Sequence, residues 1–147
     1  MKLAIIYASV HHKNTLKLLE AIKAIYQDIE LLDATKVVLK DLMSYDVIGV
    51  ASGIYFNKFH KSIAPFLENN LPEHKKVFLM YTSGAAVDFG KDIISIIQKK
   101  KCTHIGTYGC RGYDTFGPFK LVGGLQKDHP TADEIQGAID FVAQFFK

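Results

Sequence analysis

The sequence has few of the features that would place it outside the ordinary globular class. Its two cysteines, Cys102 and Cys110, fit neither a C-x-x-C motif nor a zinc site. A disulfide stays open as an alternative, but two thiols in a reducing compartment are the expectation. No apolar run approaches the roughly 20 residues of a membrane helix, and residues 1–12 contain too short an apolar stretch for a secretory signal. We therefore expect a cytoplasmic protein with no membrane partner.

The chain also lacks internal repeats, low-complexity segments and interdomain linkers. Its 147 residues suit one domain with a sizeable core. The formal net charge is only +3, and the single basic run, residues 99–101, is expected at a helix end, where lysines offset the negative end of the helix dipole. Nucleic-acid binding would need a broader basic face with interleaved aromatic residues, so we expect none.

The apolar pattern alternates between strand-like and helix-like segments. The expected strands are 2–8, 29–32, 46–52, 76–82 and 103–109. The expected helices are 15–26, 60–69, 86–99 and 131–146, with a short helix or turn at 35–43. This alternation predicts an α/β protein with a five-stranded parallel sheet covered on both faces. Ligands of such sheets bind beyond the carboxyl ends of the strands, where the strand order reverses.

Polar residues crowd the join between the first strand and the first helix, in the stretch YASVHHKNT. Ser9, Asn14 and Thr15 offer hydroxyl and amide groups beside a helix start, which favours a phosphate. Neither a G-x-G-x-x-G motif nor a G-K-[ST] motif is present, so the dinucleotide and Walker loops are excluded. Adjacent histidines rarely bind one ion, which disfavours a metal at His11 and His12. Asn14 or Thr15 as a simple helix cap stays open.

Several of these stretches together resemble the flavodoxin family, in particular its short bacterial and archaeal members. They are SVHHKNT, the SGIYF that follows the third strand, the YTSG that follows the fourth, and a Gly-rich stretch at 106–130. The resemblance covers essentially the whole chain. It implies a flavodoxin-like three-layer sandwich with strand order 2-1-3-4-5 and FMN at the switch between the first and third strands. Flavodoxin is itself a standard example of the switch-point rule.

The resemblance identifies the first loop as the phosphate loop of the family, commonly S/T-x-x-x-x-G-N-T. Ser9, Asn14 and Thr15 match that pattern, and Lys13 stands where glycine is usual. Either the loop is reshaped around Lys13 or its ammonium lies near the phosphate. The implied FMN-binding residues of this loop are Ser9, Val10, His11, His12, Lys13, Asn14 and Thr15.

The second loop matches the region that covers the inner face of the isoalloxazine ring in flavodoxins. Gly53 would let the backbone approach the ring, and in the family a flipped peptide here accepts a hydrogen bond from N5–H of the reduced flavin. Tyr55 and Phe56 offer ring faces for stacking. The other interpretation is a strand end that runs into core aromatics. The implied residues are Ser52, Gly53, Ile54, Tyr55 and Phe56.

Two further segments complete the implied site. Backbone amides of Thr82, Ser83 and Gly84 are expected at the pyrimidine edge of the flavin. Cys110, Arg111 and Gly112 belong to the stretch 106–130, whose length and aromatics indicate a lid or wall beside the cofactor.

Simpler roles stay open for the charged and thiol groups of that stretch. Arg111 and Asp114 could form an ion pair that only holds the loop. Cys110 as a nucleophile has no identifiable base, and Phe116 occupies the Arg position of a Cys-x5-Arg phosphatase loop.

We thus expect an FMN-binding electron-transfer protein with redox partner proteins. The alternatives are a small FMN-dependent oxidoreductase with NAD(P)H as electron donor, and a module that has lost FMN and binds a protein partner. A signalling receiver of the same topology is disfavoured, because Ser9 and Ser52 stand where it needs acidic residues. The pI near 8.8 contrasts with strongly acidic flavodoxins, so we expect a less negative second reduction potential and different partners. The sequence assigns no oligomeric state.

Overall fold

Five parallel strands form the middle layer of the structure, a computed structural model that describes residues 1–9, 14–55, 58–83, 90–111 and 130–146. The strands are β1 (Leu3–Ala8), β2 (Glu30–Asp33), β3 (Val47–Tyr55), β5 (Lys76–Ser83) and β6 (Thr103–Arg111), in the order β2-β1-β3-β5-β6. Without the short antiparallel β4 (Lys58–Phe59), this is the predicted order 2-1-3-4-5. The direction of strand addition reverses between β1 and β3.

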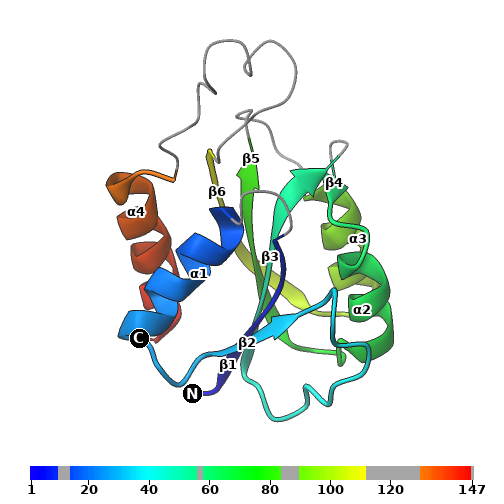
Figure 1. Cartoon of the computed structure of the whole chain (residues 1–147). Helices are drawn as coiled ribbons and strands as arrows, with labels where there is room; N and C mark the ends of the chain where they lie inside the picture. Colours follow the sequence, from blue (N-terminus) through cyan, green and yellow to red (C-terminus); the bar gives the residue numbers. More distant parts are fainter. Residues whose placement is uncertain (10–13, 56–57, 84–89, 112–129, 147) are drawn as a thin grey trace.

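Helices cover both faces of the sheet, which confirms the three-layer sandwich (Figure 1). Helix α1 (Asn14–Ile25), helix α4 (Ala132–Ala143) and the short 3₁₀ helix η2 (Gln144–Phe146) cover one face, and α2 (Ile63–Asn70) and α3 (Lys91–Lys99) cover the other. No helix within the described ranges is long and apolar enough to span a bilayer.

Two apolar clusters, one on each face of the sheet, hold the layers together. Phe78 is fully buried under α4, where its ring stacks on that of Phe145 with centroids 5.0 Å apart. Gly49 on β3 makes room for this ring, because a Cβ added there would lie 2.4 Å from Phe78 Cζ. On the other face, Leu67 and Ile97 are fully buried against the sheet. Burial on both faces explains why the central strands are continuously apolar.

The end of β3 differs from the sequence-based prediction, which ended this strand at residue 52. The strand continues to Tyr55 and turns back as β4, with Ile54 opposite Phe59 and Tyr55 opposite Lys58. The prediction read this stretch as a loop that begins at Ser52 and Gly53. Pairing with β4 supplies the hydrogen bonds that extend the strand.

The connection between β2 and β3 forms turns and no helix, so the turn, one of the two alternatives expected at 35–43, is the one that the structure has. The Asn70 side chain at the end of α2 holds it, since Nδ2 donates to Val38 O and Oδ1 accepts from Lys40 N. Leu42, a residue of this connection, is buried.

Two helices begin later than expected. Helix α2 begins at Ile63 rather than at residue 60, because the N–H of Ser62 donates to His60 Nδ1 in a turn before the helix. Helix α3 begins at Lys91, and residues 86–89 of the predicted helix lie outside the described part of the chain.

The start of α4 is fixed both by its own cap and by strand β6. Thr131 and Glu134 form a capping box. The hydroxyl of Tyr108 donates to Glu134 O at 2.7 Å. Gly137 leaves room for this contact, because a Cβ there would lie 2.5 Å from the Tyr108 hydroxyl oxygen. This hydrogen bond therefore anchors the first turn of α4 to the C-terminal half of β6.

Candidate functional site

The buried polar side chains of the described residues gather at one end of the sheet. They are Asn14 (6% exposed), Thr15 (1%), Ser52 (0%) and Thr82 (5%). All four lie where β1, β3 and β5 end, an end referred to below as the carboxyl edge. Burying a polar group is unfavourable unless it gains hydrogen bonds. The hydrogen bonds of the carboxyl edge therefore decide what this end of the sheet can bind.

At the start of α1, the hydroxyl of Ser9 caps a backbone N–H of the first turn. Ser9 Oγ accepts from the N–H of Leu16 at 3.2 Å. Asn14 and Thr15 belong to the first turn of the helix itself. Since Ser9 Oγ serves as acceptor in this bond, its hydroxyl hydrogen can still donate to an anion. The first turn of α1 thus combines hydroxyl groups with the positive end of the helix dipole.

A pair of hydroxyl groups joins helix α1 to strand β5. In the sheet, β3 lies between β5 and β1, the strand that precedes this helix. Thr15 Oγ1 lies 2.8 Å from Thr82 Oγ1, and both residues are buried. Thr82 pairs in register with Gly53 of β3. The contact links the end of β5 to the start of the helix that follows β1, across the switch point of the sheet.

Ser52 ties the end of β3 to the segment after β4. Its hydroxyl donates to Gly53 O at 2.5 Å and accepts from the N–H of His60 at 2.9 Å. The Tyr55 ring lies against Gly53, since a Cβ at Gly53 would be 3.0 Å from the Tyr55 hydroxyl oxygen. Tyr55 also meets His60 edge-on, with ring centroids 5.2 Å apart. The β3–β4 hairpin therefore places an aromatic ring beside the switch point.

Tyr7 lies near this edge, and its ionisation is clearly perturbed. Burial, and then the negative charges of Asp33 and Glu20, raise the pKa of the Tyr7 hydroxyl above its ordinary value of 10.0. Tyr7 pairs in register with Asp33 on β2 and with Ala51 on β3. The hydroxyl is therefore a neutral group at physiological pH.

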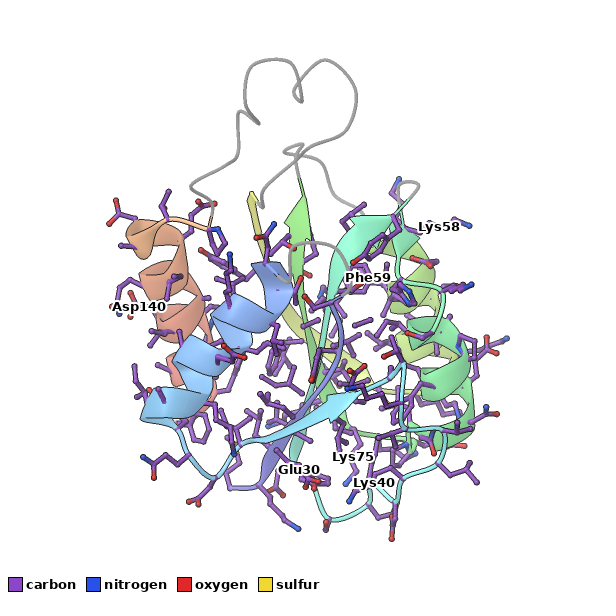
Figure 2. All side chains as sticks on the ribbon, in the orientation of Figure 1. Glu30, Lys40, Lys58, Phe59, Lys75 and Asp140 are labelled. Carbon is purple, nitrogen blue, oxygen red and sulfur yellow. The ribbon has the colours of Figure 1, made fainter. Side chains whose placement is uncertain are left out.

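Charged contacts gather at the opposite end of the sheet. Lys40 Nζ lies 3.4 Å from Glu30 Oε1, and the hydroxyl of Tyr45 donates to Glu30 Oε2. Lys75 Nζ donates to Met43 O at 2.6 Å. Figure 2 shows Glu30, Lys40 and Lys75 at that end, far from Lys58 and Phe59 of the β3–β4 hairpin. Neutral hydroxyl groups, in contrast, organise the carboxyl edge.

The structure brings the described members of the predicted site together at the carboxyl edge. They are Ser9, Asn14, Thr15, Ser52, Gly53, Ile54, Tyr55, Thr82, Ser83, Cys110 and Arg111. The register of β5 and β6 pairs Thr82 with Cys110 and Ser83 with Arg111. The remaining predicted residues lie outside the described part of the chain: Val10, His11, His12, Lys13, Phe56, Gly84 and Gly112.

Sequence reasoning missed His60, which joins the site through its backbone N–H and its ring. It stopped the second segment at Phe56, because nothing in SGIYFNKFH showed that the chain returns as β4. The apolar residues Ile54, Phe56 and Phe59 are too few and too unevenly spaced to indicate a return strand.

The described donor groups of the carboxyl edge suit a phosphate monoester. Ser9 and Thr15 offer hydroxyl groups at the start of α1, whose dipole favours an anion. The described residues contain no group of three or more His, Cys, Asp or Glu side chains placed to hold a metal ion. The side chains present at α1 thus suit the phosphate of FMN.

Comparisons with known proteins bear on the family. A family model described as flavodoxin domain matches residues 4–106. An uncharacterized protein of Methanocaldococcus jannaschii is 39% identical over 150 residues, which cover 100% of this chain and 99% of the relative. The structure is similar to a flavodoxin from the domain Archaea, with a TM-score of 0.68 and 17% identity over 99% of each chain. It is also similar to general stress protein 14 of Treponema denticola in complex with FMN, with a TM-score of 0.69 and 11% identity over 99% of this chain and 98% of that one.

Proposed function

Because this chain belongs to the flavodoxin family, we propose that it binds FMN at its carboxyl edge and transfers electrons between redox partners. Bound FMN would supply the redox chemistry, since a flavin can take up and release electrons one or two at a time. The protein would supply placement and electrostatics.

The observation that carries this proposal is the gathering of buried polar side chains at the switch point. Asn14, Thr15, Ser52 and Thr82 are the buried polar residues of the described chain, and all lie at the carboxyl edge. A core otherwise built from apolar side chains has no packing need for them. A phosphate bound at the start of α1 would account for polar side chains at this edge.

Each part of the edge has a role in this proposal. Ser9 and Thr15 would donate hydroxyl hydrogen bonds to the phosphate, and the first turn of α1 would orient it. The β3–β4 hairpin, held by the Ser52–His60 contact, would present Tyr55 as one wall for the flavin ring. The backbone of Thr82 and Ser83 would lie along the pyrimidine edge of the ring.

Titration of flavin-free protein with FMN tests the proposal. We expect quenching of flavin fluorescence with one FMN per chain and weaker binding of riboflavin, which lacks the phosphate. Protein that stays colourless after mixing with excess FMN would refute it and would favour the alternative of a module that only binds a protein partner.

The net charge points to partners and potentials unlike those of strongly acidic flavodoxins. The formal charge of +3 disfavours the anionic reduced flavin less than an acidic surface does. We therefore expect the second one-electron midpoint potential to be less negative than in acidic flavodoxins, and potentiometry that gives a very low value would contradict this. Anaerobic mixing with NADPH or NADH then separates the two redox functions, since rapid flavin bleaching would favour the reductase over the carrier.

A further inference from the structure

The side chain of Thr82 lies behind Thr15, at the contact between β5 and α1. The two hydroxyl oxygens are 2.8 Å apart and both residues are buried. The bond between Ser9 and Leu16 at the start of α1 joins residues only seven positions apart. The Thr15–Thr82 contact instead joins residues that are 67 positions apart in sequence.

Helix α1 contacts β5 as well as its nearer neighbours β1 and β3. Thr82 is the register partner of Gly53, so the hydroxyl pair lies where β3 and β5 end together. Burial also keeps water away from the pair, so the two hydroxyl groups do not exchange their mutual bond for bonds to solvent.

The direction of the hydrogen bond between the two hydroxyls is open in the protein alone, since either oxygen can donate. A hydroxyl has one hydrogen to donate and two lone pairs to accept. A phosphate dianion only accepts, so Thr15 can donate to it only if Thr82 is the donor of the 2.8 Å bond. An anion at α1 would thus fix one direction for the chain of two hydroxyls and strengthen both bonds.

We propose that Thr82 is a positioning residue for the phosphate of FMN, and that its hydroxyl donates to Thr15 Oγ1 so that the Thr15 hydroxyl is held and oriented as a phosphate donor. This inference rests on the proposed FMN function and goes beyond the role expected for the Thr82 backbone near the flavin ring. In this proposal β5 contributes to both parts of the cofactor site. Its backbone lies along the flavin ring, and its Thr82 side chain acts on the phosphate through Thr15.

The test is the ratio of riboflavin Kd to FMN Kd, measured by fluorescence titration of flavin-free variants. Thr82→Val removes the hydroxyl at nearly constant volume. We expect it to weaken FMN binding about tenfold and to change riboflavin binding less than about twofold, so that the ratio falls. Thr82→Ser keeps the hydroxyl and should retain the ratio. Thr103→Val is the matched control, because Thr103 is exposed at the far end of β6.

Other outcomes overturn the inference. Equal weakening of both flavins would show that Thr82 acts on the ring or on the fold, and unchanged affinities for both flavins would show that its hydroxyl is not used. If Thr82→Val does not fold, Thr15→Val is compared with the double variant Thr15→Val/Thr82→Val, in which no hydroxyl loses its partner. A further fall in FMN affinity in the double variant contradicts action through Thr15. Wild-type protein that binds neither flavin would refute the proposed function itself, which is a separate result.

Discussion

Replacement of Ser52 by alanine tests whether one buried hydroxyl holds the β3–β4 hairpin. Ser52 is fully buried, and its Oγ accepts from the N–H of His60 at 2.9 Å while donating to Gly53 O. Alanine would leave that N–H and that carbonyl without this partner. An unsatisfied buried group costs about 1–3 kcal/mol, and because His60 is only half-buried we expect about 1–2 kcal/mol.

The expected loss corresponds to a fall in Tm of about 2–8 °C for a chain of this length. Urea unfolding of the flavin-free protein measures it, with a lower midpoint and an unchanged m-value. Ser44→Ala is the matched control, since Ser44 is exposed and accepts only from the exposed Lys2 Nζ, so it should change stability by less than about 0.5 kcal/mol. If Ser52→Ala is no less stable than Ser44→Ala, the Ser52 hydroxyl does not hold the hairpin and the reasoning fails.

Further predictions concern the core, a titrating group and the phosphate loop. Gly49→Ala should destabilise the protein by about 1–3 kcal/mol in urea, because its Cβ would lie 2.4 Å from the buried Phe78 ring, and a neutral result would mean that the ring can shift. The pKa of Tyr7 is raised in the folded protein, so the unfolded chain binds fewer protons and stability should fall as the pH rises above about 10. Tyr7→Phe should flatten that fall, and an identical pH profile would exclude Tyr7 as its source. Lys13→Gly should leave FMN affinity intact or raise it if Lys13 is a strained substitute for glycine, and a large loss would show that its charge holds the phosphate.

Much of the fold follows from patterns within short segments. The continuous apolar runs of β1, β3 and β5 predict strands buried on both faces, and their alternation with helical spacing predicts the parallel sheet. The capping box of Thr131 and Glu134 is local too, since it depends on residues three apart. These features are local, so the sequence alone specifies them.

The location of the candidate site was predicted as well, because parallel strands bring their carboxyl ends to one edge. Ser9, Asn14 and Thr15 were singled out from their places between the first strand and the first helix, and Ser52 and Thr82 from the resemblance to the flavodoxin family. Their burial was not predicted, since a polar residue after a strand is usually exposed.

Only the tertiary structure decided which hydroxyls meet. The bond between Thr15 and Thr82 spans 67 positions, and that between Ser52 and His60 depends on a return strand of two residues. Likewise, the Asn70 side chain of α2 binds the backbone of the connection that contains Leu42, at residues 30 and 32 positions away in sequence. Residue type and spacing determine strands, helices and the edge at which a ligand would bind, because these depend on neighbours along the chain. The choice of hydrogen-bond partners depends on which segments the folded sheet brings within about 3 Å, and no local pattern encodes that distance.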